Sequence, residues 1–261
     1  MKFLITNADD FGFTTDVNEG IVHAHRHGIL TAATLMATGA AFDHAVILAH
    51  ENPELDIGVH LVLLGSPGYP ATVSGLIKAI GMRRIPIREK LVEQVRRVLE
   101  AGLRPTHLDT HKHTHLLPQV LDAVARISEE FQIPWVRRPF DLPMSASGIS
   151  WKTRLASKSF GFVRSRFHAK LAKHHCRTTD HFAGFQLTGR YRAAELSKLI
   201  RGLPEGITEF MCHPGFCTDE LRGARTRLKE SRRQELDALT SAEVRKAIAE
   251  SGVKLVRYRD L

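Results

Sequence analysis

Short apolar runs alternate with longer segments of helical periodicity along the whole chain. Runs rich in branched and aromatic side chains are typical of strands, and apolar side chains that recur every three or four residues are typical of helices. The strand-like runs are 2–6, 31–37, 56–64, 106–113, 135–138, 181–185, 208–213 and 254–258. The helix-like segments are 16–27, 42–51, 87–101, 118–131, 192–201 and 232–251. This alternation predicts an α/β fold in which helices cover a parallel sheet.

The number of strand–helix units bears on the shape of the sheet. Seven or eight units favour closure into a (β/α) barrel over an open sheet, and a chain of 261 residues has the usual size of one such barrel. The sequence shows neither an internal repeat nor a linker that would divide it. We therefore expect one domain, residues 1–261, that forms a (β/α) barrel of seven or eight strands.

The net charge of +9 is unevenly distributed. Between Asp141 and Asp180 there is no acidic residue, while eight cations gather there: Lys152, Arg154, Lys158, Arg164, Arg166, Lys170, Lys173 and Arg177. Because the excess is confined to this stretch, we expect no nucleic-acid partner and interpret residues 146–178 as a basic helical insert. Two interpretations of the insert stay open: an amphipathic helix packed on the barrel, or a lid or docking surface for an anionic or lipid-linked partner.

The N-terminal sequence and the cysteines indicate the cellular compartment of the protein. The opening "MKFLITNADD" lacks the longer apolar region and the cleavage site of a signal peptide, and no stretch approaches the roughly 18 apolar residues of a spanning helix. We expect a cytoplasmic protein, with peripheral binding to the anionic inner membrane surface open because of the basic insert. Cys176, Cys212 and Cys217 are odd in number and lack C-x-x-C spacing, which predicts reduced thiols.

Polar side chains gather where predicted strands end. Asp9 and Asp10 follow the first strand, His60 lies in the third, "THLDTHKHTH" (106–115) runs along and off the fourth, and His213 ends the seventh. The carboxyl ends of barrel strands form the active-site face, so segments 200 residues apart can meet there. These residues are therefore the candidates for chemistry.

Asp9 and Asp10 should differ in role. Neighbouring side chains on an extended backbone point in opposite directions, so the two carboxylates cannot bind one ion together unless the chain bends. One ligand and one base is the functional interpretation, and an Asx-turn or helix cap is the structural one. His60 is the single polar side chain of an apolar run, which fits either a metal ligand or a hydrogen-bonded core histidine.

Residues 106–115 hold five polar side chains at alternate positions: His107, Asp109, His111, His113 and His115. In an extended strand all five share one face, but a mononuclear metal site takes only three or four protein ligands. We expect Asp109 to orient the ring of His111, while a solvated strand end would account for His113 and His115. Imidazole and carboxylate together suit zinc and tolerate magnesium or manganese.

His213 precedes Pro-Gly, a turn signal, at the end of a predicted strand. Because imidazole titrates near neutral pH, His213 could supply the proton that a leaving amine needs. Cys212 points to the opposite side of the strand, and we expect it in the core.

Four motifs together resemble one family. The four motifs are "NADDFG" (7–12), "GVHLVL" (58–63), "THLDTHKHTH" (106–115) and "MCHPGF" (211–216). Their order and separations look like those of the carbohydrate deacetylases of the chitooligosaccharide type, the YdjC-like family. The resemblance covers essentially the whole chain. It implies a (β/α) barrel related to polysaccharide deacetylases that removes acetyl groups from N-acetylated sugars with one divalent cation, Mg²⁺ or Zn²⁺. "TTDHFAGFQLTGRY" (178–191) is more similar to a branch associated with hopanoid lipid biosynthesis, so the implied substrate is an oligosaccharide or a lipid-linked glycan.

Carried onto this chain, the resemblance implies that Asp10, His60 and His111 bind the metal and that Asp9 is the general base. We expect Asp9 to activate a water, His213 to protonate the amine and acetate to leave. His113, His115 and His181 are the candidates for substrate binding. A metal-dependent phosphoesterase and a non-catalytic metal- or sugar-binding module stay open as alternatives, and so does a homodimer.

Overall fold

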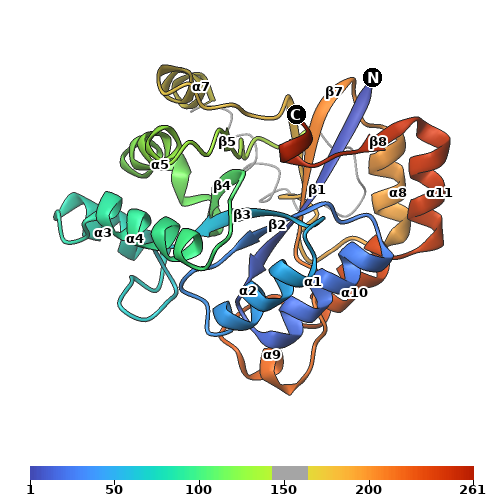
Figure 1. Ribbon diagram of the computed structural model, residues 1–261, viewed down its shortest axis with the longest axis horizontal. Helices are drawn as coiled ribbons and strands as arrows, with labels where there is room; N and C mark the ends of the chain where they lie inside the picture. Colours follow the sequence, from blue (N-terminus) through green and yellow to red (C-terminus); the bar gives the residue numbers. More distant parts are fainter. Residues whose placement is uncertain (143–163) are drawn as a thin grey trace.

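The strands are parallel and form a curved sheet that shapes a half-barrel (Figure 1). The structure is a computed structural model, and it describes residues 1–142 and 164–261. The strand order is β5–β4–β3–β2–β1–β7–β6, and β8 pairs with β1. The strands are β1 (Lys2–Phe11), β2 (Ala32–Leu35), β3 (Asp56–Leu61), β4 (His107–Thr110), β5 (Trp135–Val136), β6 (His181–Ala183), β7 (Gly206–Cys212) and β8 (Val253–Leu255).

Helices cover the outside of the sheet, and α8 and α11 pack side by side at one edge (Figure 1). The α-helices described are α1 (Thr15–His27), α2 (Phe42–Glu51), α3 (Val73–Gly81), α4 (Ile87–Glu100), α5 (Pro118–Glu130), α7 (Arg164–Lys173), α8 (Ala193–Arg201), α9 (Asp219–Gly223), α10 (Glu230–Leu239) and α11 (Ala242–Ser251). Two short 3-10 helices are η1 (His111–Leu116) and η2 (Tyr258–Asp260). The α/β class with a parallel sheet is confirmed.

Each predicted strand overlaps an observed one, but the bounds of several predicted elements differ from the observed ones, and two of these differences matter here. The first strand continues past Thr6 to Phe11, so Asp9 and Asp10 lie in it rather than after it. The predicted helix 232–251 is two helices: α10 ends at Leu239, and Ser241 caps the start of α11 by accepting a hydrogen bond from the Val244 amide at 3.2 Å.

The two ends of the sheet meet only locally. In the described parts of the chain, single bridges join Trp135 to Arg177 and Asp141 to Phe182, rather than a continuous ladder between β5 and β6. The central strand, β1, pairs with β7 from Lys2 to Ala8 and with β2 from Asn7 onward. Its long, buried course fixes the carboxylates near its carboxyl end to the middle of the sheet.

Close packing of α1 fixes the loop after β7. A Cβ atom at Gly20 would lie 2.4 Å from the Cα of Gly215, so only glycine lets this helix approach the loop so closely. Gly215 is two residues from His213. The contact therefore positions a candidate catalytic histidine.

The basic insert is described in its second half only; Lys152, Arg154 and Lys158 lie outside the described residues. In α7, Phe167 and Leu171 are buried, and Lys170 Nζ donates to Asp122 Oδ1 of α5 at 2.6 Å. Residues 164–173 thus form an amphipathic helix that packs against α5. Within the described ranges, no helix combines the length and the hydropathy that a bilayer crossing requires.

Candidate active site

A cavity of about 990 Å³ brings the predicted site segments together. Its wall includes Asp9 and Asp10 from β1, His60 from β3, His111 from η1 and His213 from the residue after β7. These residues come from strand ends or from the segments that directly follow them. The expectation that they meet on one face is confirmed.

A bend in β1 directs both aspartates into this cavity. The pairing of β1 with β2 shifts register between Ala8 and Phe11, and Asp10 has a φ of 67°. This left-handed conformation is unfavourable for most residues other than glycine, although Asp tolerates it better than branched residues do. Because the chain bends here, the strict alternation of an extended strand is broken, and neighbouring carboxylates line one cavity.

Asp10, His60 and His111 form a triangle of metal-ligand atoms. Asp10 Oδ1 lies 3.4 Å from His60 Nε2 and 3.3 Å from His111 Nδ1, and the two ring nitrogens are 3.3 Å apart. Ligands about 2.1 Å from a tetrahedral zinc ion are roughly 3.4 Å from one another. Asp10 Oδ1 is buried and accepts no hydrogen bond. An acceptor without a donor between two imidazole nitrogens fits a divalent cation.

Asp109 orients His60, not His111 as we had expected. His60 Nδ1 donates to Asp109 Oδ1 at 2.7 Å, because the two residues are register partners on β3 and β4. Thr34 Oγ1 donates to Asp109 Oδ2 at 3.1 Å and fixes the carboxylate. With its proton on Nδ1, the ring presents Nε2 to Asp10. Burial would lower the pKa of His60, but the neighbouring carboxylates, Asp109 first among them, raise it to about 9.

Arg137 binds three buried carboxylates, and the sequence had assigned it only to a strand. Its Nη1 and Nη2 donate to the two oxygens of Asp9 at 2.8 and 2.7 Å, its Nη1 lies 2.6 Å from Asp109 Oδ2, and its Nε donates to Glu209 Oε1 at 2.7 Å. Burial raises the pKa of Asp9, and Arg137 outweighs this and holds the pKa below its usual value. Asp9 is therefore a fixed, ionised carboxylate.

A second arginine that the sequence had placed only in a helix supports Asp10. Arg232 of α10 is buried, and its Nη2 donates to Asp10 Oδ2 at 2.5 Å. Burial raises the pKa of Asp10, but the Arg232 charge contributes to holding it well below its usual value. The ion pair occupies one carboxylate oxygen and leaves the other facing His60 and His111.

His213 lies beside Asp9, with its Nε2 3.9 Å from Asp9 Oδ2. Its backbone amide donates to Glu235 Oε2 at 2.6 Å, which fixes the residue on the cavity wall. The ring Nδ1 is buried without a partner, and burial lowers the pKa of the imidazole. The ring is therefore placed to exchange a proton with Asp9 or with a bound molecule.

Of the three candidates for substrate binding, His113 alone lines the cavity. It is buried with Nδ1 unpaired, and burial lowers its pKa well below the usual value. Two placements are corrected. His115 is fully buried, with Nδ1 bonded to Thr110 Oγ1 at 2.6 Å and Nε2 donating to the Arg137 carbonyl at 3.1 Å. His181 is the first residue of β6, so it lies at the amino-terminal end of that strand, away from the cavity. Its Nε2 donates to the Glu205 carbonyl at 3.0 Å.

The alternation of residues 106–115 ends at Thr110, where β4 ends. Lys112 and His113 both have a φ of 53°, so the side chains beyond the strand no longer share a face. His107 stacks on Tyr258 with ring centroids 4.0 Å apart and is a core residue. A solvated strand end was also wrong, because His113 and His115 are buried.

The cavity wall also carries cationic side chains that were not predicted as site residues. Four cations of the cavity wall are exposed: Lys112, Arg190, Arg225 and Arg227. Among the salt bridges of the described residues, none involves these four.

Cys176, Cys212 and Cys217 are unpaired, as predicted, and Cys212 is buried in the core.

Comparisons with known proteins identify relatives over the full length of the chain. The family model described as YdjC-like protein matches residues 3–250. Carbohydrate deacetylases from Brevibacillus brevis and Geobacillus stearothermophilus are each 33% identical to this chain, and the alignments cover 99% of this chain and 99% and 98% of theirs. A crystal structure from Enterococcus faecalis V583, of a protein suggested to cleave cellobiose phosphate, is 27% identical with a TM-score of 0.75 and covers 99% of this chain and 98% of its own.

Proposed function

The chain belongs to the YdjC-like family, and we propose that it removes the acetyl group from an N-acetylated sugar with the help of one divalent cation. The triangle of Asp10 Oδ1, His60 Nε2 and His111 Nδ1 carries the proposal, because it lies in a large cavity directly beside the ionised Asp9. The relatives named carbohydrate deacetylase support the same reaction.

Asp10, His60 and His111 would hold the cation. When bound there, a divalent cation polarises the acetyl carbonyl and makes a water more acidic. Asp9 takes the proton of the water that adds to the acetyl carbon, and Arg137 keeps Asp9 ionised and oriented for this step. The C–N bond then breaks and releases acetate and a free amine.

His213 gives the departing nitrogen its proton. Burial keeps the pKa of this imidazole low, so the ring is mostly neutral before the reaction and must receive a proton within the cycle. Asp9 Oδ2, 3.9 Å from His213 Nε2, is the source, since it has just accepted the proton of the water. The pair thus moves one proton from water to amine.

The phosphoesterase alternative has less support. Such enzymes commonly use two metal ions, and in the described part of the chain a second group of close ligand atoms belongs to Asp9, His60 and Asp109. Arg137 already binds both carboxylates of that group. A second cation there would face a buried positive charge.

The substrate class is proposed more narrowly as a lipid-linked N-acetylated glycan. The four exposed cations of the cavity wall support this, because a neutral soluble sugar gives no reason for them, whereas a substrate at an anionic lipid surface does.

The test combines metal content with product release. Purified protein is stripped with a chelator, reloaded with Zn²⁺ or Mg²⁺, and assayed for acetate and for phosphate on free, oligomeric and lipid-linked N-acetyl sugars and their phosphates. We expect one metal ion per chain and acetate release that depends on it. Phosphate release without acetate, or acetate release unaffected by complete metal removal, would refute the proposal.

A further inference from the structure

The helix α3 lies at the periphery of the molecule (Figure 1), and two of its apolar side chains are exposed. Val73 and Ile77 are 40% and 52% exposed, and Met82, directly after the helix, is 49% exposed, whereas Leu76 is the buried residue of α3. Val73 and Ile77 are four residues apart and therefore neighbours on one face. Exposed apolar side chains gathered in this way mark an interaction surface.

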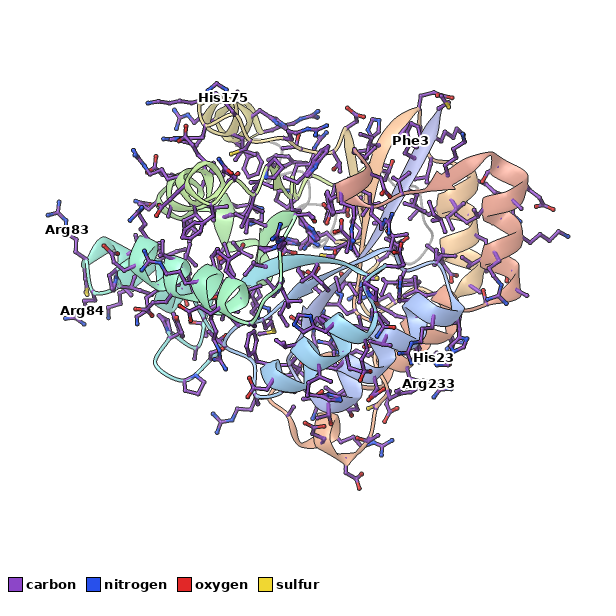
Figure 2. All side chains as sticks on the ribbon, in the orientation of Figure 1. Phe3, His23, Arg83, Arg84, His175 and Arg233 are labelled. Atoms are coloured by element: carbon purple, nitrogen blue, oxygen red, sulfur yellow. The ribbon has the colours of Figure 1, made fainter. Side chains whose placement is uncertain are left out.

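The same segment is cationic. No acidic residue occurs between Asp56 and Glu89, and Lys78, Arg83 and Arg84 are exposed. Among the described residues, no salt bridge involves these three. Figure 2 shows Arg83 and Arg84 pointing away from the body of the protein. Apolar side chains next to unpaired cations are typical of a helix that lies on an anionic membrane surface.

A short ordered segment links this helix to the cavity. Gly65, Ser66 and Pro67 line the cavity, and residues 68–72 lead from there to the start of α3. The link is held by the Gly65 amide, which donates to the Pro70 carbonyl at 2.8 Å, and by Thr72 Oγ1, which caps α3 by accepting from the Gly75 amide at 3.1 Å. A surface that binds α3 is thus connected to the cavity wall by few residues.

We propose that Val73, Ile77, Lys78, Met82, Arg83 and Arg84, which we name the α3 surface, dock the protein on the anionic surface of a lipid bilayer. A second copy of the chain is a poorer occupant, because two α3 surfaces face to face would bring six cations together. The proposal rests on the proposed function, because docking on a bilayer would bring the cavity to a lipid-linked substrate. Docking itself is measured without turnover, so it succeeds or fails separately from the proposed deacetylation.

The experiment is sedimentation with vesicles of phosphatidylglycerol or of phosphatidylcholine. Wild-type protein should sediment with the phosphatidylglycerol vesicles and not with the phosphatidylcholine vesicles. The bound fraction should fall as the salt concentration rises. The variant Lys78→Gln/Arg83→Gln/Arg84→Gln should bind about 10²-fold more weakly, because each cation near such a surface contributes appreciably. Val73→Ser/Ile77→Ser/Met82→Ser should also weaken binding, since it removes the apolar contacts.

The matched control is Arg164→Gln/Arg166→Gln/Lys173→Gln, which removes the same charge from exposed residues of α7 and should bind as the wild type does. Acetate release from a soluble N-acetyl sugar should be the same in all these variants, which shows that they are folded. Wild-type protein that ignores anionic vesicles at low salt, or binding lost in the α7 variant but kept in the α3 variant, would overturn the proposal. Self-association that only the serine variant abolishes, without vesicle binding, would assign the surface to a second copy instead.

Discussion

Asp9 and Asp10 are neighbours in the sequence, but the protein surrounds their carboxylates differently. Both oxygens of Asp9 accept hydrogen bonds from Arg137, which also binds Asp109 and Glu209. Asp10 gives one oxygen to Arg232 and keeps the other unpaired, between His60 and His111. An anion fully tied to a cation suits proton transfer at a fixed position, and one with a free oxygen suits a metal ligand. The bend at Asp10 makes this division possible.

The largest effect on metal binding and acetate release is expected at Asp10, whose Oδ1 is unpaired. Asp10→Asn removes the negative ligand and leaves Arg232 buried without its partner, so the chain should lose its metal and acetate release should fall by roughly 10³-fold. Metal content by mass spectrometry and acetate assays check this. His115→Ala, in the same buried region but off the cavity, should keep the metal. Full metal occupancy in Asp10→Asn would contradict the assigned ligand.

Arg137 should matter most for folding stability. Lysine keeps the charge of Arg137 but cannot reach three carboxylates at once, so Arg137→Lys leaves buried anions poorly paired and should lower the free energy of unfolding by about 3 kcal/mol. Chemical denaturation measures this. Arg201→Lys, at an exposed arginine paired with Glu250, is the control and should change stability little. Equal stability of the two variants would show that Arg137 is not the centre of this network.

Asp9 should affect turnover and not metal binding. Asp9→Asn retains the size of the side chain but cannot accept the proton of the water, so kcat should fall by roughly 10²-fold or more at unchanged metal content. Single-turnover acetate assays on the metal-loaded protein measure this. If Asp9→Asn loses the metal while Asp10→Asn keeps it, the two roles are exchanged.

Asp109 separates orientation from ligation. Asp109→Asn can still contact His60 but no longer carries the charge that fixes the proton on Nδ1, so metal affinity should fall by about 10- to 100-fold. Competition with a fluorescent chelator gives the affinity. A loss confined to kcat would assign Asp109 to the support of Asp9 through Arg137 instead.

The sequence predicted elements and the meeting of segments better than it predicted contacts. Alternating apolar runs located the strands, and the rule that strand ends share a face brought Asp9, Asp10, His60, His111 and His213 together correctly. Arg137 and Arg232 were missed because the sequence does not distinguish a buried arginine from an exposed one; the difference lies in carboxylate partners that come from other segments of the chain. One signal was available: Arg137 directly follows the apolar pair Trp135–Val136 of β5, so it stands at the carboxyl end of a strand, where the other site residues gather.

Two errors come from arguing within one segment of the chain, and the first of them assumed that the strand pattern of residues 106–115 continues. Beyond Thr110 the backbone turns, so the partner of Asp109 is set by register with His60 across β3 and β4 rather than by spacing along the chain. His181 was placed by its residue type alone, without regard to which end of its strand it occupies. Spacing within a segment reports local geometry only; pairing between strands depends on the register of the whole sheet.

The smallest expected effect concerns Arg232 and sharpens the contrast between the two arginines. Arg232 contacts a single carboxylate, Asp10, whose other oxygen faces the metal-ligand nitrogens. Lysine can still neutralise that carboxylate from one point, so Arg232→Lys should keep the metal and change its affinity by less than about tenfold. The same chelator competition that serves Asp109→Asn measures this, with denaturation as a second readout. If Arg232→Lys instead loses the metal as completely as Asp10→Asn, the precise fork of Arg232 is required to present Asp10 Oδ1, and the two arginines act alike as rigid supports for their aspartates.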